Sequence, residues 1–84
     1  MLHVSVISPE ASLYEGDATS VVAPAFDGEV GILTGHAPMM TLLGKGELRI
    51  DDGAKRFAIE GGFLQVVANN VRVVTEKGAP TKGA

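Results

Sequence analysis

The sequence contains no cysteine and no tryptophan among its 84 residues. Without cysteine the chain has no disulfide, no thiolate ligand for a metal and no cysteine nucleophile, so packing has to stabilise the fold. Aromatic residues make up only 5% of the chain. Sugar-binding modules and readers of single-stranded nucleic acid usually need aromatic stacking surfaces, so this scarcity argues against both classes.

Positive charge is also scarce, because 7 Lys and Arg residues are set against 10 Asp and Glu residues, for a formal net charge of −3. An acidic chain is unsuited to electrostatic binding of nucleic acid or anionic lipid. No segment approaches the roughly 20 apolar residues of a membrane helix, and the first residues lack the basic start of a signal peptide. We therefore expect one small intracellular domain whose partner is a protein or a neutral surface.

The sequence does contain many short segments in which apolar and polar residues alternate, separated by Gly, Pro, Asp and Asn. Alternation with a period of two is typical of strands with one buried face, and no long amphipathic helix pattern is present. The clearest hairpin spans residues 47–60 and turns at Asp52-Gly53. A second hairpin spans residues 63–75 and turns at Asn69-Asn70. Further strands are expected at residues 2–7, 13–14, 18–23, 28–33 and 39–43, with a turn at Gly16-Asp17.

This pattern predicts an all-β fold, a sandwich or flattened barrel of short strands and hairpins. Pro9 and Pro24 are expected to end the strands that precede them, because proline donates no hydrogen bond to a ladder. Residues 77–84 show no periodic pattern. We therefore expect the sandwich domain to span residues 1–76 and residues 77–84 to form a mobile tail.

The most distinctive stretch runs from Gly28 to Pro38, where three glycines, a proline, Glu29 and His36 fall within a short span. Glycine allows backbone angles closed to other residues, so the stretch predicts a shaped turn between two strands, with His36 at its apex. Such a turn could perform chemistry, bind a partner or only redirect the chain.

A catalytic role for His36 as a general base lacks support elsewhere in the sequence. The only other histidine is His3, in a different expected strand, and neither has a carboxylate at metal-ligand spacing. No hydrolase elbow, phosphate-binding loop or dinucleotide fingerprint is present. We therefore assign no catalytic residue, no cofactor site and no metal site, and an enzyme using His36 stays an alternative.

Two further features leave alternatives open. Lys45 between two glycines is reminiscent of small all-β carrier domains, which attach lipoate or biotin to a hairpin lysine, although its flanking residues differ from Asp-Lys-Ala and Met-Lys-Met. The apolar run from Met39 to Leu43 is either core or an adaptable binding surface. A strand with apolar residues on both faces cannot easily bury both, so one face is expected to be covered by another protein.

Several segments form a distinctive combination: Gly28 to Pro38, Ser8-Pro9-Glu10, Tyr14-Glu15-Gly16, Gly61 to Val66, and Asn70, Val71 and Val73. Together they resemble the epsilon chain of F-type ATP synthases, in its N-terminal β-sandwich domain. The resemblance covers about Leu2 to Thr75. It departs from the family pattern at Val30, Thr34, Glu60 and Gln65, where the family more often has Leu, Pro, Ser and Glu.

The resemblance implies a ten-stranded β-sandwich that serves as a non-catalytic rotor subunit of the central stalk, coupling proton transport to ATP synthesis. Its implied partners are the gamma chain and the membrane-embedded c-subunit ring. It implies a peripheral location, through those partners only, on the cytoplasmic face of a bacterial inner membrane. The implied contacts are Glu29, Gly31 and His36 toward the ring, and Met39, Met40, Thr41 and Leu42 toward the gamma chain.

Most members of that family continue into a pair of C-terminal helices that can inhibit ATP hydrolysis and in some members bind ATP. The 84 residues stop before such helices. We therefore expect neither an inhibitory switch nor a nucleotide site within these 84 residues.

Overall fold

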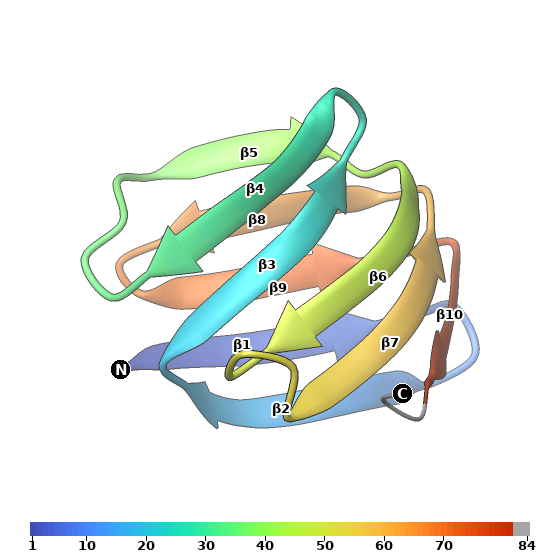
Figure 1. The fold of residues 1–84 in the computed structure, drawn as a ribbon, viewed down its shortest axis with the longest axis horizontal. Coiled ribbons are helices and arrows are strands. Elements are labelled where there is room, and N and C mark those ends of the chain that lie inside the picture. Colours follow the sequence, from blue (N-terminus) through green and yellow to red (C-terminus); the bar gives the residue numbers. More distant parts are fainter. Residues whose placement is uncertain (82–84) are drawn as a thin grey trace.

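The computed structural model describes residues 1–81, which form ten strands and no helix (Figure 1). Two five-stranded sheets lie face to face and make a β-sandwich, as the alternation predicted. The first sheet has the order β2-β1-β9-β8-β5 and the second β10-β7-β6-β3-β4. The strands are β1 Leu2–Ile7, β2 Ser12–Ala18, β3 Ser20–Ala25, β4 Gly28–Leu33, β5 Met39–Leu42, β6 Lys45–Ile50, β7 Lys55–Glu60, β8 Phe63–Val67, β9 Asn70–Val74 and β10 Lys77–Pro80.

The core consists of the inward-facing residue of each alternating pair. Leu2, Val4 and Val6 of β1 are completely buried, while the residues between them are exposed or half-buried. The same alternation runs through β6, β8 and β9, and Tyr14 meets Phe57 edge to face with ring centroids 6.1 Å apart. The other completely buried apolar residues are Ala18, Val21, Ala23, Ile32, Leu48, Ile50, Leu64, Val66 and Val73.

β4 and β5 follow each other along the chain but belong to different sheets, and each is an edge strand (Figure 1). A bridge between Ala25 and Leu43, and a hydrogen bond of 3.0 Å from Phe26 N–H to the Leu42 carbonyl, join the sheets at this edge. The segment from Gly28 to Leu42 therefore passes from the second sheet to the first along one side of the sandwich.

The turn between β2 and β3 lies at Thr19, not at the predicted Gly16-Asp17. β2 continues through both residues because its ladder to β1 continues there, pairing Gly16 with Val4. Pro24 likewise lies inside β3 and does not end it. β3 pairs with β6 only at Val21 and Val22, so the missing N–H of the proline falls outside that short ladder.

The second hairpin turns one residue earlier than expected, at Ala68-Asn69, where the φ angles are +49° and +65°. Asn70 already belongs to β9, where it pairs with Val67 of β8. Positive φ at both central residues is what a type I′ hairpin loop requires, and asparagine tolerates it better than alanine does. Because alanine occupies the first of these two positions, the sequence pattern places the turn one residue too late.

The expected tail from residue 77 onward is partly wrong, because Lys77–Pro80 forms β10 on the edge of the second sheet, paired with β7. The hydroxyl of buried Thr75 donates to the Lys77 carbonyl at 2.7 Å and fixes the corner before this strand. Backbone pairing holds β10, which has no apolar alternation to reveal it. Residues 82–84 of the expected tail lie outside the described residues.

A carboxylate ties the corner between β2 and β3 to the turn between β6 and β7. Asp51 Oδ1 accepts hydrogen bonds from the Thr19 N–H at 2.7 Å and from the Thr19 hydroxyl at 2.9 Å. These bonds, the backbone N–H first, hold the pKa of Asp51 below its usual range. The ionised carboxylate therefore joins two turns that are far apart in the sequence.

We predict that Asp51→Asn lowers stability most near neutral pH. Because the folded-state pKa lies below the unfolded one, the carboxylate stabilises the fold above the unfolded pKa, and this stabilisation is lost as pH falls through the folded-state pKa. In urea unfolding, the difference between wild type and variant should shrink as pH falls from about 4 toward 2. Asp52→Asn, at a neighbour with φ of +55° and no bond to Thr19, should show a smaller difference throughout. A pH-independent difference for Asp51→Asn would contradict the prediction.

Two leucines allow a matched test of the core. Leu48 is completely buried and Leu42 is 63% exposed. We expect Leu48→Ala to lower the free energy of unfolding by about 2–5 kcal/mol, because it leaves a cavity, and Leu42→Ala to lower it by less than about 1 kcal/mol. Equal losses in urea titrations would show that Leu42 is part of the core.

Candidate protein-docking edge

The glycine-rich stretch forms β4 and the turn that follows it, as the sequence predicted. The turn closes with a hydrogen bond of 3.1 Å from His36 N–H to the Leu33 carbonyl, and Gly35 within it has φ of +86°. Gly35 N–H donates to Asn69 Oδ1 at 2.7 Å. The turn between β4 and β5 is thereby fastened to the turn between β8 and β9 of the other sheet.

His36 is half-buried at this turn, and its Nδ1 lies 2.7 Å from the carbonyl oxygen of Ala37. The other histidine, His3, lies on the outer face of the first sheet, 3.4 Å from Glu15 and 3.4 Å from Asp17. The two imidazoles thus have different polar neighbours, although the His3 N–H donates to the carbonyl of Asn69 at 2.8 Å, the residue whose side chain holds Gly35. Residues 1–81 contain no group of three or more His, Cys, Asp or Glu side chains that could hold a metal ion.

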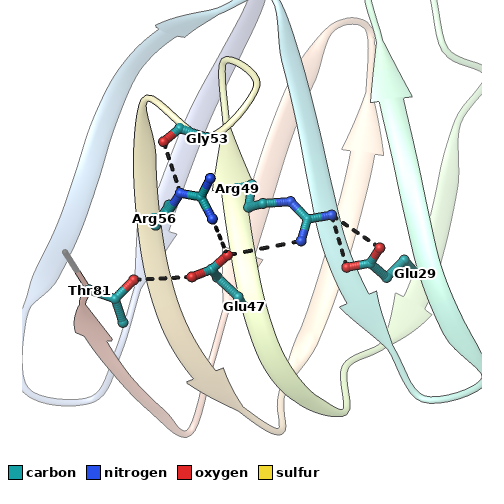
Figure 2. Close-up of polar contacts among 6 residues, drawn as sticks. All are labelled: Glu29, Glu47, Arg49, Gly53, Arg56 and Thr81. Carbon is teal, nitrogen blue, oxygen red and sulfur yellow. Dashed lines mark hydrogen bonds and ion pairs between the residues drawn. The ribbon is translucent and has the colours of Figure 1, made fainter. Parts of the chain in front are cut away.

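Glu29 lies at the other end of β4, with its side chain 55% exposed. The carboxylate reaches across β3 to Arg49 on β6, whose Nη2 lies 3.0 Å from Oε2 and 3.1 Å from Oε1 (Figure 2). Glu29 and His36 are therefore not brought together. They mark the two ends of an exposed edge strand that is about 20 Å long by the usual rise per residue.

Gly31 lies between them on the same outward face of β4 and is exposed. A Cβ atom placed on Gly31 would meet no other atom within 4 Å, and its φ is not positive. Neither the backbone nor the packing of the described residues therefore requires glycine there. Its absent side chain leaves the outer face of the edge strand flat between Glu29 and Leu33.

Polar contacts continue from Arg49 across the outer face of the second sheet (Figure 2). Arg49 Nη1 lies 4.0 Å from Glu47 Oε1, and Arg56 Nη1 donates to the same oxygen at 2.8 Å. The Thr81 hydroxyl lies 3.4 Å from the other carboxylate oxygen of Glu47. Sequence reasoning missed these arginines. Alternation along β6 shows that Arg49 faces outward, but only the strand order shows that it meets Glu29.

β5 divides the four residues expected to contact the gamma chain into two pairs. Met40 and Leu42 point outward and are 64% and 63% exposed. Met39 packs against the core, and Thr41 is half-buried opposite Leu64. Met40 and Leu42 therefore offer a partner the most exposed surface of the four.

The exposed apolar surface continues from β5 across the first sheet. The strand registers place Leu42 opposite Phe63, Phe63 opposite Val74, and Val74 opposite Ile7. The last three of these side chains are half-buried. The result is an apolar row across four strands on the outer face of the first sheet.

Lys45, the alternative carrier lysine, lies in β6 opposite Glu60 of β7 and not at a hairpin tip. It borders a groove of about 460 Å³ across β6, β7 and β10, whose small residues include Ala58 and Ala79. Only β3 lies between this groove and β4 in the strand order, and Glu47 and Thr81 of the polar contacts are among the residues that line it. The described residues contain no helix able to cross a membrane.

Comparison with known families identifies the domain. Residues 1–80 match the family described as the ATP synthase delta/epsilon chain β-sandwich domain. The chain belongs to this family. The match includes β10, so the family domain extends past the boundary at residue 76 that periodicity suggested.

Relatives named ATP synthase epsilon chain share much of the sequence. The chain is 48% identical over 80 residues to one from Leptospira borgpetersenii, covering 93% of this chain and 63% of the relative. It is 40% identical over 77 residues to one from Caulobacter vibrioides, covering 89% of this chain and 90% of the relative. The chain thus spans a little under two thirds of the Leptospira relative.

Two solved assemblies contain chains with the same fold. A chain of the Euglena gracilis mitochondrial ATP synthase OSCP/F1/c-ring structure superposes with a TM-score of 0.84 at 21% identity, over 94% of this chain and 52% of that one. A chain of the Tetrahymena thermophila central stalk/c-ring structure gives 0.80 at 17% identity, over 93% and 65%. At these identities the likeness shows the β-sandwich fold alone.

The bond from Gly35 to Asn69 can be tested without disturbing the backbone. Asn69→Gly keeps a residue that readily adopts φ of +65° but removes the acceptor. We expect the Gly35 amide to exchange with solvent about tenfold faster in NMR hydrogen exchange, because opening of this turn breaks one bond fewer. Asn70→Ser serves as the control, because Asn70 does not contact Gly35. An unchanged Gly35 exchange rate would show that the bond does not hold the turn.

Proposed function

We propose that this domain is a non-catalytic rotor component of the ATP synthase central stalk that links the gamma chain to the c-subunit ring. One observation carries the proposal: the joined edge strands β4 and β5 present two different surfaces on opposite faces of one sandwich. Glu29 and Gly31 lie on the outer face of the second sheet, while Met40 and Leu42 lie on that of the first. A domain that joins two partners requires two such surfaces on one rigid body.

The ring side of the proposal rests on Glu29, Gly31 and His36. They line an exposed edge that is flat at Gly31 and polar at both ends. The polar loops at the end of a ring of membrane helices offer donors and acceptors more than apolar groups, and a carboxylate that is 55% exposed can accept hydrogen bonds from them. The acidic domain contacts the membrane only through these partners and requires no cofactor.

The gamma side rests on Met40 and Leu42. Two large apolar side chains, each more than 60% exposed, are costly to leave in water and gain free energy when a partner covers them. Met39 and Thr41 contribute indirectly, because they anchor the strand that presents Met40 and Leu42.

The proposed mechanism is mechanical. Torque from the ring has to reach the gamma chain without slippage, so the connecting domain has to resist shear. The ladders of both sheets and the closely packed core between them provide that stiffness. Fastening of the 34–38 turn to Asn69 holds the two docking surfaces in a constant relation.

We predict that substitutions on the two surfaces weaken binding to different partners. Met40→Glu with Leu42→Glu should weaken binding to the purified gamma chain roughly thirtyfold or more, because charges replace apolar contacts. Glu29→Ala with His36→Ala should instead weaken binding of the domain–gamma complex to detergent-solubilised c-ring. Both effects would be measured as Kd values by surface-immobilised binding assays.

Leu33→Glu is the matched control for the gamma chain, because Leu33 is 64% exposed but lies on the second sheet. It should leave gamma binding within about threefold of wild type, a surface change worth no more than about 0.6 kcal/mol. Wild-type protein that fails to bind the gamma chain at micromolar concentration would refute the proposed function. If the Glu29 and His36 variant loses melting temperature along with ring binding, the weaker binding reflects lost stability, and the site is structural.

A further inference from the structure

Glu29 is held in place before any partner arrives. Both of its carboxylate oxygens lie within 3.1 Å of the single nitrogen Nη2 of Arg49 (Figure 2). A glutamate on an edge strand would otherwise sample many rotamers, and ordering it on binding would cost side-chain entropy. The contact with Arg49 lowers that cost, because it already restricts the carboxylate in the free protein.

Arg49 is itself restrained. Its side chain is 31% exposed, much less than the 55% of Glu29, and its Nη1 approaches Glu47 at 4.0 Å. Glu47 is fixed in turn by Arg56 at 2.8 Å, and Arg56 Nε donates to the Gly53 carbonyl at 3.1 Å. The guanidinium that holds Glu29 is thus braced by the β6–β7 hairpin of the same sheet.

The charges of this network cancel, because two glutamates are matched by two arginines. Glu29 therefore meets a partner as one half of an ion pair and not as an isolated anion. Its oxygens retain lone pairs that point away from Arg49, and its exposure leaves them reachable. A surface of this kind fits a partner that supplies hydrogen-bond donors in fixed positions, such as the amides and hydroxyls of a structured loop.

We propose that Arg49 is a positioning residue for the ring contact: it does not touch the ring but orients Glu29 for it. The inference rests on the proposed function, because it concerns how Glu29 engages the c-ring. It adds a residue on β6 to a site that the sequence placed on β4 and the following turn alone.

The test is a double-mutant cycle with the domain–gamma complex binding to detergent-solubilised c-ring. Arg49→Met removes the guanidinium and should weaken ring binding about tenfold. In a Glu29→Ala background the same change should have less than a twofold effect, because there is no carboxylate left to position. Arg49→Lys keeps a positive charge near Glu29 and should give an intermediate Kd.

Lys55→Met is the matched control, because Lys55 is exposed on the neighbouring β7 and its loss removes the same charge. It should leave ring binding within about twofold of wild type. The melting temperature of Arg49→Met should stay close to that of Lys55→Met, since partly exposed ion pairs contribute little to stability.

The outcomes separate this inference from the function on which it rests. If Glu29→Ala weakens ring binding and Arg49→Met does not, the positioning role is overturned while the ring contact stands. If Arg49→Met weakens binding equally with and without Glu29, Arg49 contacts the ring itself and the positioning role is likewise overturned. If Glu29→Ala has no effect, the ring contact at Glu29 fails and the inference fails with it.

Discussion

Alternation of inward and outward side chains along the strands shapes the rest of this structure. A chain of 84 residues without cysteine, and without a helix among residues 1–81, has only the space between two sheets in which to bury apolar groups. Every strand that contributes to the core must therefore give its alternate residues to it. The remaining residues of each strand face outward, and the proposed docking surfaces are made from them.

The passage of the chain from β4 to β5 places outward residues on both faces of the sandwich, as the proposed function requires. Because the two strands are edges of different sheets, their outward residues face opposite ways: Glu29 on one side, Met40 and Leu42 on the other. The turn between them is fixed by Gly35 and Asn69. In the proposed function, the two partners attach to one body along a single edge.

The polar contacts on the outer face of the second sheet contribute differently from the apolar contacts in the core. They lie on a surface that water reaches, so they add little to stability. Their effect is to restrict the conformations of the side chains involved. Glu29, Arg49, Glu47 and Arg56 form a line from β4 to β7 across the outer face, and each side chain limits the freedom of the next.

Alternation and turn residues were enough to predict the all-β sandwich, the hairpin at Asp52-Gly53 and the strand Gly28–Leu33, because these depend on local backbone preferences and on which face of a strand is apolar. Local signals were misleading where pairing overrode them. β2 runs through Gly16-Asp17 because β1 pairs with it there, and β10 forms because β7 offers an unpaired edge.

The candidate site likewise combines features that local sequence predicts with features that depend on strand pairing. Local sequence is enough to predict the turn at the glycine-rich stretch and to place Met40 and Leu42 on one face of a strand, since a period of two requires it. The contact of Glu29 with Arg49 across β3, and the opposite orientation of the two proposed docking surfaces, are seen only in the folded structure. Strand order within a sheet, and the assignment of β4 and β5 to different sheets, come from pairing between distant segments, which no local pattern records.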